Sequence, residues 1–84
     1  MADVHVKYDG SSHTIEFDEL FPTERHVAIG IPVGTEVSPQ TVNQQHVRTA
    51  LAQYFDVALD EFEDHFVEIN PNGNITVRPE ATFG

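Results

Sequence analysis

The clearest periodic pattern in the chain is SPQTVNQQHVRTALAQYF, residues 38–55. Its apolar side chains recur three and four positions apart, the spacing that places them on one face of a helix. The pattern starts with Ser38, a favourable N-cap, and Pro39, which is tolerated in a first helical turn. We therefore predict an amphipathic helix over residues 39–55. Its apolar stripe comprises Val42, His46, Val47, Ala50, Leu51, Tyr54 and Phe55.

Before this helix, two stretches of alternating apolar and polar residues, 4–8 and 13–17, flank a turn sequence that contains Gly10. This combination predicts a β-hairpin. With Gly10-Ser11 as the loop, Tyr8 pairs with His13, whereas Asp9-Gly10 as the loop shifts the pairing by two residues. Both registers keep the same faces. The predicted buried face carries Val4, Val6, Tyr8, His13, Ile15 and Phe17, and the exposed face carries His5, Lys7, Thr14 and Glu16.

After the helix, a second hairpin is predicted around Pro71-Asn72-Gly73. Proline, asparagine and glycine suit, in that order, a three-residue loop made of a type I turn and a left-handed residue. This loop pairs Ile69 with Ile75 and Val67 with Val77, so four apolar side chains share one face. A two-residue Asn-Gly turn would mix the faces, and we favour the three-residue loop.

The stretches that join these elements are less regular. Residues 17–25 predict a loop in which Leu20 and Phe21 are apolar anchors. Residues 26–33 alternate apolar and other side chains and predict an extra strand. That strand lies at a sheet edge or ends at Pro32, because proline cannot donate a backbone hydrogen bond to a neighbouring strand.

Together these elements predict one small α+β domain over residues 1–84, with a short C-terminal tail at 79–84. Two β-hairpins and an extra strand would pack on one amphipathic helix. This arrangement resembles the β-grasp fold of small prokaryotic ubiquitin-like proteins, in which the sheet wraps the apolar stripe of the helix. Conjugated modifiers of that family typically end in Gly-Gly. Here the chain ends in the single glycine Gly84, which the resemblance implies as a candidate conjugation site.

Fourteen Asp and Glu against four Lys and Arg give the chain a net charge of −10. Nucleic-acid phosphates and anionic membranes are bound mainly through Lys and Arg, so we expect neither as a direct partner. No apolar run approaches the roughly 20 residues that span a bilayer, and the N-terminus does not resemble a signal peptide. We expect a protein of the cytoplasm or of the interior of a larger assembly. Its charge suits a basic protein partner, cations or solubility in salt.

No catalytic constellation is recognisable in the sequence. The chain has no cysteine, which excludes a thiolate nucleophile and a zinc ribbon. The segment 30–34 contains two glycines but not the lysine and the hydroxyl residue that follow in a phosphate-binding loop. Glu61 and His65 are spaced to meet on one helical face, but two ligands do not make a selective metal site. We therefore expect no enzymatic activity, no cofactor and no metal.

The most unusual local feature is a run of six carboxylates within thirteen residues, 56–68, that contains no Lys or Arg. It lacks the spacing of a calcium loop. Like charges at this density are relieved by solvent, by salt or by a cationic partner. Residues 56–64 are predicted to form one or two helical turns, held to the core by Leu59 and Phe62. We predict that the acidic stretch is a docking surface in which Phe62 and Phe66 are apolar anchors for a partner. The predicted partner-binding residues are Asp56, Asp60, Glu61, Phe62, Glu63, Asp64 and Glu68, supported by Asp18, Glu19 and Glu24. A merely solvated acidic face is the alternative.

Four functions stay open from the sequence. The leading hypothesis is a non-enzymatic interaction module that docks on a basic protein. The second is a DNA mimic that inhibits a nucleic-acid enzyme, as anti-restriction and anti-CRISPR proteins do. The third is a ubiquitin-like modifier or sulfur carrier acting through Gly84, and the fourth is a structural component of a virus or other assembly. An edge strand at 26–33 would also be able to pair with a partner or with a second copy.

Overall fold

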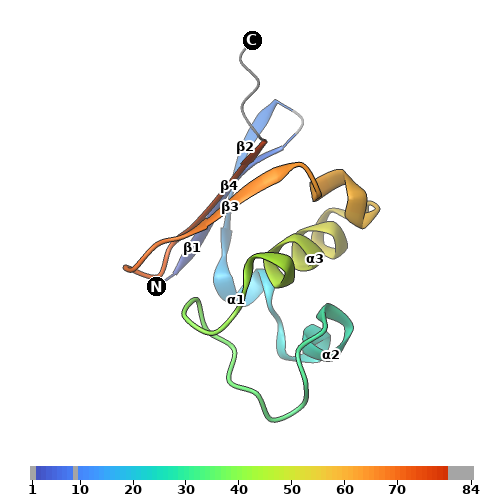
Figure 1. Ribbon diagram of the computed structural model, residues 1–84, viewed down its shortest axis with the longest axis vertical. Coiled ribbons are helices and arrows are strands. Elements are labelled where there is room, and N and C mark those ends of the chain that lie inside the picture. Colours follow the sequence, from blue (N-terminus) through green and yellow to red (C-terminus); the bar gives the residue numbers. More distant parts are fainter. Residues whose placement is uncertain (1, 9, 80–84) are drawn as a thin grey trace.

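A four-stranded mixed sheet with one long helix packed against one face forms the body of the molecule (Figure 1). The computed structural model describes residues 2–8 and 10–79. The fold class is α+β, as predicted. In chain order the elements are β1 (Asp3–Tyr8), β2 (Ser11–Glu16), α1 (Phe17–Leu20), η1 (Thr23–Arg25), α2 (His26–Ile29), α3 (Gln44–Phe55), η2 (Leu59–Phe62), β3 (His65–Ile69) and β4 (Ile75–Pro79), where η marks a 3₁₀ helix.

The strands lie in the order β2-β1-β4-β3. Each sequential hairpin is antiparallel, and the two central strands, β1 and β4, pair in parallel. The first and last strands of the described chain therefore lie side by side in the middle of the sheet. The sheet buries the apolar face of each strand against α3 and leaves the other face open.

Both hairpins form where the turn chemistry predicts them. In the first, Tyr8 pairs with Ser11. That register leaves positions 9 and 10 as the loop, although Asp9 lies outside the described residues. In the second, Ile69 pairs with Ile75 and Val67 with Val77, which confirms the three-residue loop. Gly73 takes a left-handed φ of 97°, and its N–H donates to the Asn70 carbonyl at 3.0 Å.

The long helix begins at Gln44 rather than at residue 39, so the predicted start is wrong. Asn43 caps it reciprocally, because its side chain accepts from the His46 N–H at 2.7 Å while its own N–H donates to the His46 ring at 3.4 Å. Upstream, the Thr41 hydroxyl donates to the carbonyls of Glu36 and Ser38, which favours a turn over a helical continuation. The predicted end at Phe55 is confirmed.

The predicted extra strand at 26–33 is also wrong. Residues His26–Ile29 form the single helical turn α2, which Gly30 ends with a left-handed φ of 106°. The Ile31 N–H then donates to the His26 carbonyl at 2.9 Å. Because Gly30 reverses the chain, Ile29 and Ile31 are both buried although no strand forms. Among the described residues the sheet edges are β2 and β3, so the proposed edge pairing at 26–33 is excluded with it.

The core lies between the sheet and α3, and the short elements close its end. Residues 17–25, predicted as a loop, form α1 and η1, yet Leu20 and Phe21 are buried as expected. Figure 1 shows α2 and the connection to α3 at the end of the molecule opposite the tip of the first hairpin. Of the predicted tail, Pro79 ends β4 and residues 80–84 lie outside the described residues. The fully buried aliphatic side chains are Val4, Val6, Val47, Leu51, Val67, Ile75 and Val77.

Candidate functional site

The acidic segment forms a tight connection between α3 and β3. Asp56 ends α3 with a left-handed φ of 59°, and the next N–H, that of Val57, returns to the Ala52 carbonyl at 2.9 Å. Such a left-handed residue at a helix end satisfies carbonyls that would otherwise lack a partner. The chain then enters η2, which packs against α3. The segment therefore follows the end of the helix directly and forms a 3₁₀ turn that packs against it.

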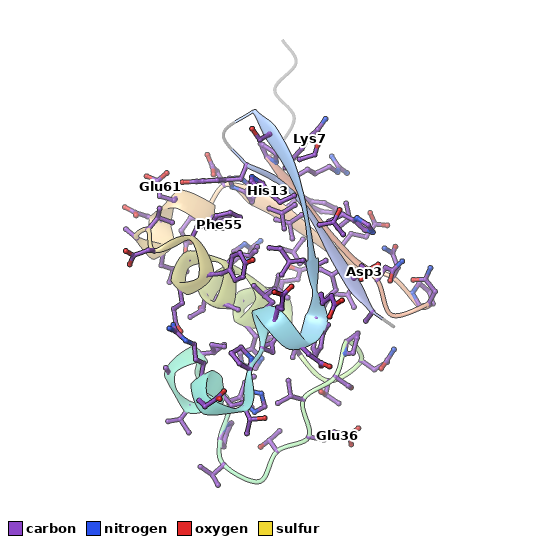
Figure 2. All side chains as sticks on the ribbon, turned by 180° about the vertical axis from the view of Figure 1, so that it is seen from behind. Asp3, Lys7, His13, Glu36, Phe55 and Glu61 are labelled. Carbon is purple, nitrogen blue, oxygen red and sulfur yellow. The ribbon has the colours of Figure 1, made fainter. Side chains whose placement is uncertain are left out.

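Five of the predicted carboxylates share this connection, and all five side chains belong to exposed residues. We call this group the acidic end; its members are Asp56, Asp60, Glu61, Glu63 and Asp64. Glu61 accepts a hydrogen bond from the Tyr8 hydroxyl at 3.4 Å, so the acidic end touches the first hairpin. Figure 2 shows Glu61 in the same region as His13 and Phe55.

The charges of the acidic end are poorly compensated by the protein itself. Asp64 Oδ1 lies 3.1 Å from Nδ1 of the buried His65 ring, and within residues 2–8 and 10–79 no Lys or Arg lies within ion-pair distance of a carboxylate. Arg48, the arginine of α3, donates two hydrogen bonds from its guanidinium to the His65 carbonyl, at 3.1 and 3.3 Å. Over the described part of the chain, no carboxylate of the acidic end therefore pairs with a Lys or Arg.

Phe62 is not an exposed anchor, so its predicted role as a partner-binding residue is wrong. Its side chain is 0 % exposed and lies in an aromatic cluster. Ring centroids lie 4.9 Å away in Tyr8, 4.9 Å away in His65 and 6.0 Å away in Phe55. Because η2 packs against α3, one of its side chains faces the core, and that side chain is Phe62.

Glu68 and Phe66 are separated from the acidic end by the alternation of β3. His65 and Val67 are buried, so Phe66 and Glu68 point to the open face of the sheet. There the Arg78 guanidinium carbon lies 4.9 Å from the centre of the Phe66 ring. Phe66 is 43 % exposed but pairs with a cation of this chain. The predicted seven-residue site thus divides into the acidic end, one core residue and one open-face carboxylate.

The sequence assigned Tyr54 to the apolar stripe of the helix and Leu59 to the anchors of residues 56–64, but both side chains are exposed. Tyr54, in the last turn of α3, is 46 % exposed, and Leu59, which starts η2, is 37 % exposed. They lie on either side of Asp56 along the chain. The sequence does contain a signal for the exposure of Tyr54, because this residue lies at the margin of the apolar stripe of the helix. Of the predicted supporting acids, Glu19 lines a depression of about 160 Å³ together with Tyr54 and Arg25, and no carboxylate of the acidic end lines it.

Three of the histidines serve local structure. His26 Nε2 donates to the Phe21 carbonyl at 3.0 Å, His46 completes the helix cap, and His65 is 7 % exposed against Phe62. Within the described ranges no group of three His, Cys, Asp or Glu side chains is placed to hold a metal ion. No helix in that part of the chain is long and apolar enough to cross a membrane.

Comparisons with protein-family models, with curated proteins and with solved structures find no match to this chain.

Proposed function

We propose that the protein is a non-enzymatic interaction module that binds a basic partner protein through the acidic end. The observation that carries the proposal is the set of five exposed carboxylates on the connection between α3 and β3, unpaired with any Lys or Arg of the described chain. Facing charges of opposite sign steer association and select partners. The proposed setting is the cytoplasm, as the sequence predicts.

Charge alone gives little affinity, since an exposed ion pair contributes only about 0.2–1 kcal/mol. The acidic end needs apolar contacts that lose water on binding, and Tyr54 and Leu59 supply them in place of Phe62. Tyrosine is enriched among the residues that dominate binding energy. The proposed interface is therefore Tyr54 and Leu59, flanked by the carboxylates of the acidic end.

We also propose that the fold is β-grasp-like. The two hairpins, the parallel pairing of β1 with β4 and the helix across one face support this assignment. Fold likeness conveys no function by itself. Action through Gly84 as a modifier or sulfur carrier, and mimicry of DNA, stay predictions from the sequence. Adenylation of the C-terminal carboxylate would identify the former, and competition with DNA for a nuclease or restriction complex the latter.

The test compares two variants with the same change of charge. The first removes three charges of the acidic end through Asp60→Asn, Glu61→Gln and Glu63→Gln. The control removes three exposed charges elsewhere through Glu16→Gln, Glu36→Gln and Glu68→Gln. Immobilised wild type captures proteins from its native extract, and mass spectrometry identifies those that elute with salt.

We expect a basic protein that the control variant retains and that the acidic-end variant releases at lower salt. Tyr54→Ala should weaken retention at every salt concentration, because its contribution is apolar. Capture that is equal for the wild type and the acidic-end variant would sink the proposal.

A further inference from the structure

The open face of the sheet carries a cationic row that is unusual for so acidic a chain. Side chains alternate along each strand, and Val6 is level with Val77 in the parallel pair. The next residues, Lys7 and Arg78, therefore lie on neighbouring strands with their side chains on the open face. On the other side of β1, Lys7 pairs with Ser12. Two of the four basic residues of the chain thus lie side by side.

This row opens onto a groove in the same face. The groove has a volume of about 380 Å³, within the range of small-molecule sites. Two residues before Lys7 on β1, His5 is paired with Thr14 of β2 on one side and with Thr76 of β4 on the other. Their polar groups line the floor, where the Thr14 hydroxyl lies 3.5 Å from His5 Nδ1. Figure 2 shows Lys7 near one end of β1 and Asp3 near the other, so the acids of that strand end lie away from the row.

The cations of this row have no ion-pair partner among the described residues, and Glu68, a carboxylate of the same open face, is level with Thr76 and not with Arg78. Like charges on neighbouring strands repel, and neither Lys7 nor Arg78 forms an ion pair within residues 2–8 and 10–79. The Arg78 guanidinium carbon lies 4.9 Å from the centre of the Phe66 ring, and a guanidinium packed on an aromatic face can still donate hydrogen bonds from its N–H edges. The overall negative charge does not cancel this locally, since salt screens charges beyond about 8 Å at physiological ionic strength.

We propose that this groove binds the phosphate group of a small polyhydroxylated molecule, such as a sugar phosphate. A phosphomonoester carries nearly two negative charges at neutral pH, which matches the two permanent cations. Arg78 would contact its oxygens as a planar fork and Lys7 as a point charge. The groove is larger than one phosphate, and the floor of Thr14, His5 and Thr76 suits the hydroxyl groups of an attached sugar. A long polyanion such as nucleic acid would meet the net charge of −10 outside the groove.

The test is a titration of the ¹⁵N-labelled protein, followed by amide shifts in 0.15 M NaCl. The probes are glucose 6-phosphate, glucose, inorganic phosphate and succinate. We expect glucose 6-phosphate to shift amides of β1, β2 and β4, to bind more tightly than inorganic phosphate or succinate, and glucose to cause no shift. Lys7→Gln and Arg78→Gln should each weaken binding by up to about five-fold, the effect of losing one exposed charge pair. Arg25→Gln is the matched control, because it removes one exposed cation outside the groove.

Several outcomes would overturn the inference. Absence of shifts with glucose 6-phosphate, or equal weakening by Arg25→Gln, removes the site. Equal affinity for succinate contradicts phosphate as the recognised group. Equal affinity for inorganic phosphate contradicts the sugar contacts of the floor.

Discussion

Replacement of Phe62 by alanine should nearly unfold the domain, although Phe62 lies in the most acidic stretch of the chain. Its side chain is 0 % exposed and its ring lies 4.9 Å from those of Tyr8 and His65. Removal of a buried phenylalanine costs about 3–5 kcal/mol. Total stabilities are only about 0.05–0.15 kcal/mol per residue. Since each kcal/mol shifts Tm by about 4–8 °C in a domain of this size, we expect a fall of roughly 12 to 40 °C.

The matched control for this prediction is Phe66→Ala, the same substitution four positions later. Phe66 is 43 % exposed, and its contact with Arg78 is an exposed cation–π pair worth about 0.5–1 kcal/mol. We expect its Tm to fall by less than about 10 °C. Thermal unfolding followed by circular dichroism measures both variants. A Phe62→Ala variant that melts within a few degrees of the wild type would refute the packing account of η2. So would a fall in Tm that is smaller for Phe62→Ala than for Phe66→Ala.

Three further predictions concern the helix cap, the turn after α2 and the net charge. Asn43→Ala should lower the free energy of unfolding in urea by about 1 kcal/mol, and Ser38→Ala by clearly less, because only Asn43 caps α3; equal effects would return the helix start to residue 39. Gly30→Ala should destabilise by about 1–3 kcal/mol in the same assay, since its φ of 106° strains any side chain; an unchanged midpoint would contradict that conformation. Raising NaCl from low to moderate concentration should raise the Tm, because salt screens the repulsion among the carboxylates. The rise in Tm should be smaller in the Asp60→Asn, Glu61→Gln, Glu63→Gln variant, which has fewer carboxylates to screen. A Tm that falls with salt in the wild type would contradict this prediction.

Much of the sheet is predictable from local chemistry. Period-two alternation places Val4, Val6 and Ile15 on one face in either register of the first hairpin, and the faces were therefore predictable while the register was not. In the second hairpin, the need to keep Ile69 and Ile75 on one face selects a single loop. Both conclusions rest on contacts between residues close in the chain.

The errors arise where two local signals compete. Ser38 and Pro39 are good helix starters, but the Thr41 hydroxyl holds a turn there by donating to the Glu36 and Ser38 carbonyls, and Asn43 and His46 cap the helix at Gln44. At 26–33, apolar residues two apart indicate a strand, yet the helical turn that Gly30 ends buries only Ile29 and Ile31 of that set and leaves Val27 and Val33 exposed. A periodicity over eight residues cannot separate these cases.

The candidate sites depend on tertiary placement. The acidic end was recognisable as a run of charge, whereas the burial of Phe62 depends on η2 packing against α3. Glu68 leaves the group because β3 alternates. The proximity of Lys7 and Arg78 follows from the parallel pairing of β1 with β4, which joins opposite ends of the chain and leaves no local signal.

The salt dependence of partner affinity tests the central claim most directly. For a basic protein captured by the wild type, the dissociation constant is measured across a series of NaCl concentrations, with the wild type and with the Asp60→Asn, Glu61→Gln, Glu63→Gln variant. We predict that affinity falls steeply with salt in the wild type and that the variant binds more weakly with a shallower dependence. Identical affinity and identical salt dependence in the two proteins would contradict the acidic end as the docking surface.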